Sequence, residues 1–535
     1  MNPLEANALK KPRSTARMQA ALAIVCACAS VVLAGCGGGG GGGGGGGVAL
    51  PIILPPTTAA PASSGNDDAI VASATVAGLC AAPRTGTNPE TGTSYPDKAG
   101  SLTDEKRWVR GWINETYLWY GEVPTTLKAA DYATPVAYFS VLKSPATTAS
   151  GRAKDRFHYV YDTERYRQLS QNGVAPGYGM EFAFVRNSRP RDLRIAFTEP
   201  GSPAASAGIA RGAKVLEVDG IDVIEGTNTT VINRGISPTT VGESHTFKLQ
   251  EGSATRTVTL AAASITRTPV QNVKTIDTSS GRVGYLLFND HITTSEAQLI
   301  DAVNQLKAGS GIQDLVLDMR YNGGGQLNIA SRLATMVASP AATSGKTFER
   351  LVFNDKNPFN LTPAQAVIPF YGTSRSGTPL PTLGLSRVTV LVGPDTCSAS
   401  ESVINSLRGV DVQVNLVGGA TCGKPYGFSP QDNCGTSYFA IQFQGVNAKD
   451  FGDYGDGFAP SCTVADDFDH ALGDPAEARL AAALAIRNGG ACPASASAKT
   501  LPGLEKPDAA AEQPYLLHRT PLREIRLLEA APSPS

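Results

Sequence analysis

The sequence is poor in histidine and in net charge. It has five His among 535 residues, and its 46 basic and 47 acidic side chains leave a formal net charge of -1 at pH 7. Because the basic and acidic side chains nearly cancel, the net charge gives no electrostatic basis for a nucleic-acid partner. Only His291, near the end of an apolar stretch, suits catalysis, and a structural role is the commoner one for such a residue. Chemistry that depends on a histidine is therefore disfavoured.

The spacing of the cysteines does not suggest a metal site. A zinc site needs close pairs of Cys or His, and those pairs are missing. His470 lies among Asp466, Asp467 and Asp469, but an acidic cluster of this kind is usually a solvated loop. We expect no metal, nucleotide or organic cofactor. Beyond Cys36, six cysteines remain, and an even count in an exported chain favours disulfides, with fifteen possible connectivities: Cys80, Cys397, Cys422, Cys434, Cys462 and Cys492.

The N-terminus has the pattern of an export signal. Basic residues precede an apolar run over 18–33, which ends in Leu-Ala-Gly-Cys at Cys36. The run is short and small-residued for a transmembrane helix, and the order basic, apolar, small is typical of a signal peptide. The last four residues resemble the lipobox of bacterial lipoproteins, which implies cleavage after residue 35 and lipidation of Cys36. An uncleaved anchor and a plain secretory signal are the alternatives.

Lipidation would place the protein in the cell envelope. Several acyl chains on one cysteine give durable anchoring, whereas a single chain is marginal. Gly37, rather than an acidic residue, follows Cys36 and favours an outer-membrane or periplasmic location. A glycine tract over 37–47 then provides a flexible tether.

Changes in composition divide the rest of the chain. Residues 36–100 are rich in Gly, Pro, Ala, Thr and Ser, which predicts a disordered tether. Residues 101–172 contain all three Trp, and a helix capped by Thr103 is expected in a small helical domain with an aromatic core. The remaining boundaries predict a β-rich domain over 173–265, an α/β core over 266–490 and a disordered tail over 491–535.

The β-rich region shows short strands separated by glycine turns around one small Ala-rich helix. Its order of elements resembles a PDZ domain, notably in the run from Gly208 to Leu216 and in the hairpin Val218-Asp219-Gly220. A PDZ-like fold adds an extended peptide to a strand edge and can hold a terminal carboxylate. The resemblance implies a peptide site at four consecutive residues: Gly177, Tyr178, Gly179 and Met180. A spacer domain without a ligand is the alternative.

From about residue 270 strands and helices alternate, which favours crossover βαβ units with functional loops at the strand ends. One predicted strand ends at Met319 and runs into Arg-Tyr-Asn-Gly-Gly-Gly. Another ends at Val392, and a turn of small residues follows it up to Ser398. A third, over 412–417, precedes the loop that holds Lys424.

Ser398 and Lys424 together suggest a hydrolase. A serine hydroxyl is a weak nucleophile until a base takes its proton, and a desolvated lysine amine can be that base. Ser398 lies where a strand meets a predicted helix, so the amide of Ala399 is a natural donor to an oxyanion. If the two residues meet, Cys397 and Cys422 also come close, and a disulfide between them would brace the site.

The chain is identified as a member of the carboxyl-terminal processing (tail-specific) serine peptidases, in a divergent lipoprotein branch. The resemblance rests on the runs from Leu315 to Gly325, from Ser398 to Glu401 and from Leu416 to Lys424, and it covers roughly residues 101–490. It implies a multidomain α/β protein with a crotonase-like peptidase core, an inserted PDZ-like domain and a small N-terminal helical domain. It also implies Ser398 as nucleophile, Lys424 as general base, and an oxyanion hole from Ala399, Gly324 and Gly325.

Three positions depart from the family pattern. The family often has a Gln shortly after the Lys to orient its amine, whereas here the residues after Lys424 are Pro-Tyr-Gly-Phe, ending at Phe428. Cys422 stands where an aromatic residue is common, and the glycine turn lacks a Pro. The third catalytic group is therefore not identified by the resemblance.

The sequence thus predicts a lipid-anchored serine endopeptidase. The PDZ-like domain would capture a C-terminal or extended segment of a protein substrate, and Ser398 would form an acyl-enzyme. The alternatives are a catalytically silent peptide-binding scaffold of the same fold and a hydrolase of non-peptide esters or amides. The oligomeric state is not predicted.

Overall fold

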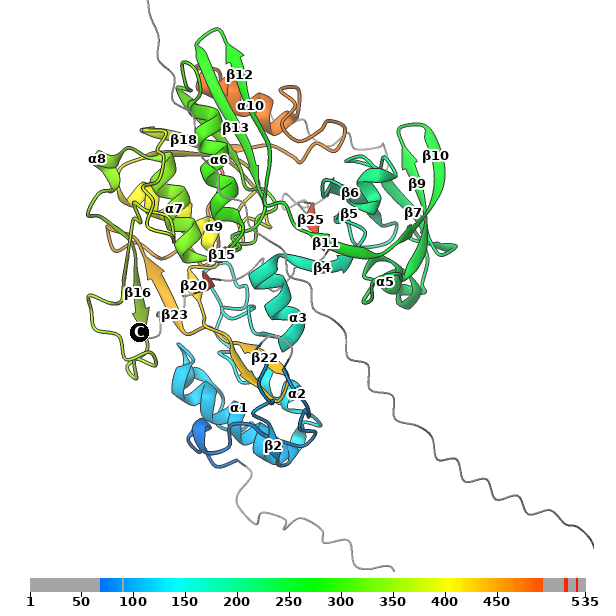
Figure 1. Ribbon diagram of the computed structural model, residues 1–535, viewed down its shortest axis with the longest axis vertical. Helices are drawn as coiled ribbons and strands as arrows, with labels where there is room; N and C mark the ends of the chain where they lie inside the picture. Colours follow the sequence, from blue (N-terminus) through cyan, green and yellow to red (C-terminus); the bar gives the residue numbers. More distant parts are fainter. Residues whose placement is uncertain (1–67, 89–90, 494–513, 518–525, 528–535) are drawn as a thin grey trace, which may run out of the picture. The chain divides into compact units, whose positions relative to one another are not determined.

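The computed structural model of the protein describes residues 68–88, 91–493, 514–517 and 526–527 (Figure 1). The predicted signal peptide, the lipidation site Cys36 and the glycine tract lie outside the described residues. No helix within those ranges is long and apolar enough to cross a membrane.

The first described part is a helical domain with an aromatic core. Its longest helix is capped by Ser101, whose Oγ accepts a hydrogen bond from Asp104 N, so the predicted cap at Thr103 is wrong by two residues. Trp108 and Trp112 stack at 5.6 Å between ring centroids, and both rings also contact Tyr438, more than 300 residues further on. The helices and strands of this part are η1 (Ser73–Thr75), β1 (Leu79–Cys80), β2 (Lys98–Ala99), α1 (Leu102–Thr116), η2 (Tyr120–Glu122), η3 (Ala129–Asp131), α2 (Pro135–Phe139), β3 (Tyr159–Asp162), α3 (Thr163–Arg167) and the π-turn η4 (Gln168–Asn172).

The prediction of a disordered tether up to residue 100 is wrong for the described residues from 68 onwards. They contain β1 and β2, which pair in parallel, and Cys80 is buried and bonded to Cys434. Composition did not reveal this order because a disulfide over a sequence separation of 354 residues fixes a segment that has few apolar residues of its own.

A β-rich domain follows, and its first and last strands pair with each other. Strand β4 (Val174–Gly177) enters it and β11 (Ala263–Thr266) leaves it, in an antiparallel pair. Between them a sheet runs in the order β10-β9-β7-β6-β5-β25, with β8 beside β7. The predicted strands and the Ala-rich helix are present: β5 (Met180–Arg186), β6 (Asp192–Thr198), α4 (Pro203–Ser206), β7 (Lys214–Val218), β8 (Ile221–Asp222), α5 (Thr229–Ile236), β9 (Ser244–Glu251) and β10 (Ala254–Ala261).

The sixth strand of this path comes from the far end of the chain. Strand β25 (Tyr515–Leu516) pairs antiparallel with β5, and Leu516 is 1% exposed. The predicted disordered tail is therefore wrong at these residues. It is also wrong at β26 (Arg526–Leu527), whose backbone pairs with β15 (Gly325–Gln326). Strand addition depends on a distant edge, which local composition does not encode.

The core of the remaining chain is a six-stranded sheet in the order β12-β13-β14-β18-β19-β24. Within this sheet the neighbouring strands β13, β14, β18, β19 and β24 are parallel, and β12 is antiparallel to β13. The main elements are β12 (Val270–Thr278), β13 (Gly281–Phe288), α6 (Ser295–Lys307), β14 (Asp314–Asp318), α7 (Leu327–Val337), β18 (Arg387–Val392), α9 (Ala399–Gly409), β19 (Gln413–Gly418), β24 (Cys462–Thr463) and α10 (Ala478–Arg487).

Alternation along the strands divides this sheet into two buried faces. On β13, Leu286 and Phe288 pack with residues of α6, α7 and α9. Tyr285 and Leu287 point the other way and pack with α10 and with residues of the β-rich domain. Because both faces are covered, the strands are apolar throughout, as parallel strands usually are. The predicted α/β core is confirmed.

Smaller elements make up the rest of the described chain. A second sheet runs in the order β17-β16-β23-β20, and a hairpin of β21 and β22 extends to β3 of the helical domain. Their bounds, with the short helix α8, are α8 (Pro340–Thr343), β16 (Thr347–Phe353), β17 (Val367–Pro369), β20 (Tyr426–Gly427), β21 (Gln431–Asn433), β22 (Thr436–Phe439) and β23 (Phe443–Val446).

All six cysteines beyond Cys36 form disulfides. The pairs are Cys80–Cys434, Cys397–Cys422 and Cys462–Cys492. The predicted pairing of Cys397 with Cys422 is confirmed.

Candidate active site

Ser398 lies at the turn between β18 and α9 in a constrained backbone conformation. Its φ is 58° and its ψ is -117°, and the residue is fully buried. A non-glycine residue at positive φ persists only where the surrounding structure holds it, and such strain collects at functional sites. Strand, sharp turn and helix is also the arrangement that presents the nucleophilic serine in α/β-hydrolases. Ser398 Oγ makes no hydrogen bond to any described residue.

The carboxylate of Glu401 joins the Ser398 turn to the Lys424 loop. It accepts backbone hydrogen bonds from Ser398 at 2.9 Å, Lys424 at 2.8 Å and Gly423 at 2.8 Å. It also accepts one from Thr421 Oγ1 at 2.6 Å. Burial raises the pKa of Glu401, while these four donors act in the opposite direction. The donors satisfy a group that would otherwise be costly to bury.

The Cys397–Cys422 disulfide reinforces the same junction. Cys397 immediately precedes Ser398, and Cys422 lies two residues before Lys424. Cys422 N also donates to Thr396 O at 3.0 Å. The two loops therefore share a covalent bond, a backbone hydrogen bond and the Glu401 carboxylate.

The same cluster contains a triad of possible metal-ligating groups. Among the described residues, the potential ligand atoms of Cys397, Glu401 and Cys422 lie within 4.8 Å of one another. Because the two sulfurs are bonded to each other, they are not available as thiolate ligands, and the triad is a structural junction.

Lys424 is fully buried, and aromatic rings surround its amine. Nζ lies 4.1 Å from the ring centroid of Phe428 and 4.9 Å from that of Phe157. Phe428 is the residue near which the family pattern places a polar orienting group. Two aromatic rings therefore form part of the wall around the Lys424 amine.

The helical domain contributes to the Lys424 loop. Phe157 and Arg156 both belong to the helical domain. The Arg156 guanidinium donates a hydrogen bond to the carbonyl oxygen of Cys422. The same guanidinium reaches Gly423 O and Gly455 O at 3.4 Å each. This part of the chain therefore fixes one wall of the site.

Gly324 lies against the Ser398 turn. Its φ is 106°, and an added Cβ would come within 2.8 Å of both Ser398 Cβ and Ala399 N. Only glycine allows this approach. The Gly324 amide donates to Asn322 Oδ1 at 3.0 Å. Gly325 instead lies against His291, because its added Cβ would be 2.3 Å from His291 O.

Asn322 connects the glycine turn to both Ser398 and His291. Its carbonyl oxygen accepts from Cys397 N at 3.1 Å and from Ser400 Oγ at 2.9 Å. Its Oδ1 is 3.0 Å from His291 Nδ1, and since Oδ1 is an acceptor, Nδ1 carries the proton. Burial lowers the pKa of His291 to about 4, which leaves the ring neutral at pH 7.

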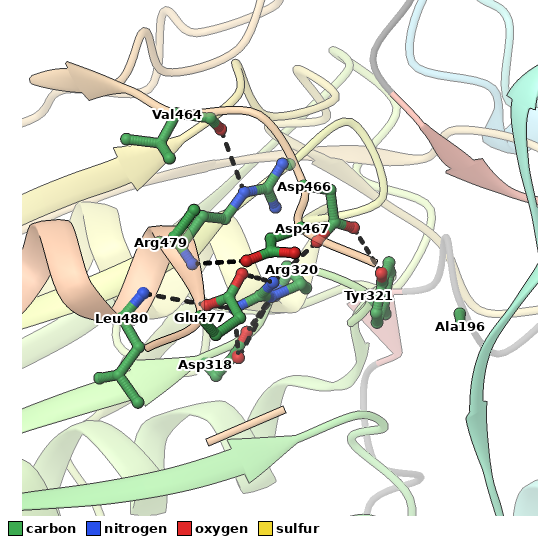
Figure 2. A network of polar contacts seen from close by, with 12 residues as sticks. Ala196, Asp318, Arg320, Tyr321, Val464, Asp466, Asp467, Glu477, Arg479 and Leu480 are labelled. Atoms are coloured by element: carbon green, nitrogen blue, oxygen red, sulfur yellow. Dashed lines mark hydrogen bonds and ion pairs between the residues drawn. The ribbon is translucent and has the colours of Figure 1, made fainter. Parts of the chain in front are cut away.

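A buried ion network surrounds Arg320, which precedes the glycine turn in the sequence (Figure 2). Arg320, two residues after the end of β14, is fully buried between Asp318 at 2.9 Å, Glu477 at 2.8 Å and Asp466 at 2.7 Å. Burial alone would raise the pKa of Asp466, but the surrounding guanidinium groups hold it well below its usual value. The prediction of a solvated acidic loop is wrong at Asp466, because its partners are distant in sequence.

Arg211 brings the β-rich domain into this network. Its guanidinium donates to Tyr321 Oη at 2.8 Å, to Asp466 at 2.7 Å and to Ala196 O at 2.7 Å. Tyr321 also donates to Asp466 and immediately precedes Asn322. The β-rich domain is thus linked by hydrogen bonds to the turn that carries Gly324.

The predicted peptide site lines a pocket between the β-rich domain and α3 of the helical domain. The pocket has a volume of about 260 Å³, and its walls include all four predicted residues together with two acidic and two basic side chains: Gly177, Tyr178, Gly179, Met180, Glu181, Glu199, Arg165 and Arg267. Burial raises the pKa of Glu199 to about 7, against the effect of Arg267.

Several residues of the site were not foreseen individually. Glu401 ends the run that begins at Ser398, and its position three residues after Ser398 is the spacing of a helix capping box. Asn322, Thr421, Arg156 and Phe157 act through contacts between loops that are far apart in sequence. No local pattern marks such contacts.

Comparison with known proteins connects this arrangement to one group of enzymes. Residues 282–444 match the profile described as peptidase family S41, and residues 104–159 match that of the peptidase S41 N-terminal domain. A carboxyl-terminal-processing protease of Picosynechococcus sp. is 30% identical over 274 residues, 50% of this chain and 60% of the relative. The chloroplastic carboxyl-terminal-processing peptidase 3 of Arabidopsis thaliana is 26% identical over 314 residues, 56% of this chain and 53% of the relative.

A solved structure shows the same fold. A Bacteroides fragilis protein assigned to the S41 proteases aligns with a TM-score of 0.56 and 23% identity, over 74% of this chain and 98% of its own. The chain spans between half and two thirds of the length of the two curated relatives named above.

Proposed function

Because this chain belongs to peptidase family S41, we propose that it is a serine endopeptidase in which Ser398 is the nucleophile and Lys424 the general base. The observation that carries the proposal is the Glu401 carboxylate, which binds the backbone of both residues. A binding scaffold has no need to hold a strained serine and a buried lysine on one carboxylate.

The first half of the reaction forms an acyl-enzyme. Lys424 Nζ takes the proton from Ser398 Oγ as the oxygen attacks the carbonyl carbon of the scissile peptide bond. The tetrahedral oxyanion accepts hydrogen bonds from Ala399 N, at the start of α9, and from the glycine turn. Lys424 then gives its proton to the leaving amine. In the second half Lys424 takes a proton from water as the water oxygen attacks the ester carbonyl. The bond between the acyl carbon and Ser398 Oγ then breaks, Oγ recovers that proton, and the carboxylic acid product leaves.

On substrate binding one hydrogen bond has to form and another has to be exchanged. Ser398 Oγ has to engage Lys424, and Gly324 N has to exchange Asn322 Oδ1 for the oxyanion. Catalytic hydrogen bonds often tighten only in the complex with substrate. Asn322 is itself held by Phe288 O, which accepts from Nδ2 at 2.9 Å, so a small rotation about the glycine residues is the simplest adjustment.

The β-rich domain is proposed to be PDZ-like and inserted into a crotonase-like core. In its support, β4 and β11 pair at the entry and exit of the domain, and the pocket lined by Gly177 to Met180 opens at the start of β5. The substrate would be a protein that offers a C-terminal or extended segment to this domain.

The protein is proposed to be lipid-anchored at Cys36 and to work in the cell envelope, towards the outer membrane and periplasm. Three disulfides support an oxidising compartment, since such bonds rarely persist in a cytosol. Palmitate labelling of the full chain in cells, with a Cys36→Ser control, tests the anchor.

A fluorophosphonate probe tests the nucleophile directly. Labelling is expected in the wild type, lost in Ser398→Ala and reduced at least a hundredfold in Lys424→Ala. Ser402→Ala is the matched control, because this serine is equally buried in α9 and its hydroxyl also makes no hydrogen bond to a described residue. The His291→Gln variant should also react with the fluorophosphonate probe.

Absence of labelling in the wild type, with and without added peptide, would favour a catalytically silent scaffold. Labelling together with turnover of small esters but of no peptide or protein would favour a non-peptide hydrolase.

A further inference from the structure

The chain supplies its own extended segment to the open edge of the β-rich sheet. Tyr515 faces Phe184 and Leu516 faces Ala183 in the antiparallel pair of β25 and β5 (Figure 1). Leu517 N continues the ladder to Phe182 O at 2.8 Å. Antiparallel addition to an edge strand is the way an extended peptide ligand binds a sheet.

The side chains of this segment alternate between two apolar surfaces. Leu516 is buried in the cluster that contains Ala183, Phe197 and Tyr321, so it bridges the β-rich domain and the core. Leu517, half-buried, points the other way and packs against the core of the β-rich domain. An extended strand places successive side chains on opposite sides, so two adjacent leucines fill both surfaces.

Tyr515 completes this contact at the outer end. Its ring lies 6.1 Å from that of Phe184, and its hydroxyl accepts a hydrogen bond from Asn187 Nδ2 at 2.6 Å. The edge therefore fits an extended peptide with the pattern aromatic, Leu, Leu.

The same segment contacts the loop that carries the nucleophile. Leu516 N donates to Asp395 Oδ2 at 2.8 Å in a buried hydrogen bond, and Asp395 lies three residues before Ser398. The Leu516 amide is therefore hydrogen-bonded to the core, while the neighbouring amide of Leu517 is hydrogen-bonded to β5.

A second piece of the chain pairs with the glycine turn. The backbone of β26 runs parallel to β15, with Arg526 opposite Gly325 and Leu527 opposite Gln326. Strand β26 also lies near β20, which begins two residues after Lys424. The edges of β5 and β15 are thus both paired with later segments of the same chain.

We propose that residues 514–517 and 526–527 are a built-in ligand of this protein, which a substrate of the same chemical class has to displace. The class is an extended peptide with an aromatic residue followed by two leucines, bound by β5. The proposal rests on the proposed peptidase function for its effect on turnover, whereas its effect on peptide binding can be measured without catalysis.

A cross-link between facing residues tests the proposal in the full chain. Phe184 and Tyr515 are both half-buried and opposite each other, so dibromobimane should bridge the variant F184C/Y515C without reductant and leave the native disulfides intact. In a Ser398→Ala background, binding of a fluorescein-labelled peptide that contains Tyr-Leu-Leu is followed by anisotropy. With Ser398 present, peptide turnover is followed as well.

The cross-linked protein is expected to bind the peptide at least tenfold more weakly than the same variant before cross-linking, and to lose at least tenfold in kcat/KM. The single variants F184C and Y515C, treated in the same way, should show no such change. Leu517→Asp, which places a charge against an apolar surface, should release the segment and tighten peptide binding at least threefold.

Equal peptide affinity before and after cross-linking, with intact melting behaviour, would overturn the proposal. A wild type that binds the peptide but never reacts with a fluorophosphonate would instead overturn the peptidase function and leave the built-in ligand standing.

Discussion

Ser398 N and Lys424 N donate to the same oxygen, Oε2 of Glu401, at 2.9 Å and 2.8 Å. The relation places the backbones of the proposed nucleophile and the proposed base on a single buried atom. A shift of either loop is felt by the other through that oxygen. Glu401 is therefore a positioning residue, and its removal should affect the reaction more than the affinity for substrate.

Glu401→Gln keeps the size of the side chain but replaces one acceptor oxygen by an NH2 group that faces backbone donors. We expect kcat to fall about a hundredfold with KM changed less than threefold, since a small misplacement of reacting groups is costly. The free energy of unfolding should fall by about 2 kcal/mol, as a buried donor loses its acceptor. Peptide kinetics and urea denaturation measure the two effects.

Thr421→Val is the matched control for Glu401→Gln. It removes one of the four donors to the Glu401 carboxylate and leaves the backbone amides of Ser398 and Lys424 hydrogen-bonded to it. A larger loss of kcat in Thr421→Val than in Glu401→Gln would contradict the positioning role of Glu401.

The two disulfides with similar loop lengths should separate stability from activity. Cys397–Cys422 and Cys462–Cys492 close separations of 25 and 30 residues. Chain entropy gives each about 3 kcal/mol of stability, so the double alanine variants should have similarly lowered melting temperatures. Only the variant of the first pair should lose activity, by about tenfold or more, because that bond joins the Ser398 and Lys424 loops. Equal activity in the two variants would contradict this role.

Acid should destabilise the protein through His291. Its pKa is about 4 in the folded state and about 6.5 in the unfolded chain, so the unfolded chain binds more protons between these values. The stability that depends on the neutral ring is fully present above pH 6.5 and is lost as the pH falls towards 4, by up to about 3 kcal/mol.

His291→Gln should therefore lose less stability than the wild type between pH 7 and pH 4.5, measured by denaturant titration at each pH. A wild type and a variant with parallel pH profiles would show that the buried ring does not titrate in this range.

Glu199 should make the protein less stable as the pH rises, which is opposite to the effect of His291. Burial raises the pKa of its carboxyl to about 7, so the folded state binds more protons than the unfolded chain from about pH 4.5 to pH 7. Stability from this group is greatest below pH 4.5 and falls as the pH rises through 7, by up to about 3 kcal/mol.

Glu199→Gln keeps an acceptor for Thr268 N and cannot ionise. The free energy of unfolding of the variant relative to the wild type should rise by about 2 kcal/mol between pH 5 and pH 8. A difference that stays the same at both pH values would contradict the raised pKa.

Local patterns were enough to predict the elements that hold Ser398, Lys424 and Gly324. Each lies after an apolar strand, and small residues or glycine follow that strand in the sequence. The distance between Cys397 and Cys422 followed from the same reasoning. What local patterns lacked was the partner of each group.

The unpredicted features all depend on contacts over long separations. Phe157 and Arg156 reach the Lys424 loop from more than 260 residues away, and Asp466 is buried only because Arg320 and Arg211 surround it. Leu516 is ordered by β5 rather than by its neighbours in sequence. Burial of a charge or an isolated leucine is a property of the folded environment, which a window of sequence does not contain.

The Cys80–Cys434 bond makes most of the described chain one covalent ring. The ring contains Ser398, Lys424 and every strand of the β-rich domain except β25, and the bond between Cys80 and Cys434 closes it. A single backbone cut within residues 81–433 would leave both fragments attached through the sulfurs. A nicked molecule would keep its catalytic loops together and would separate into two pieces only on a reducing gel.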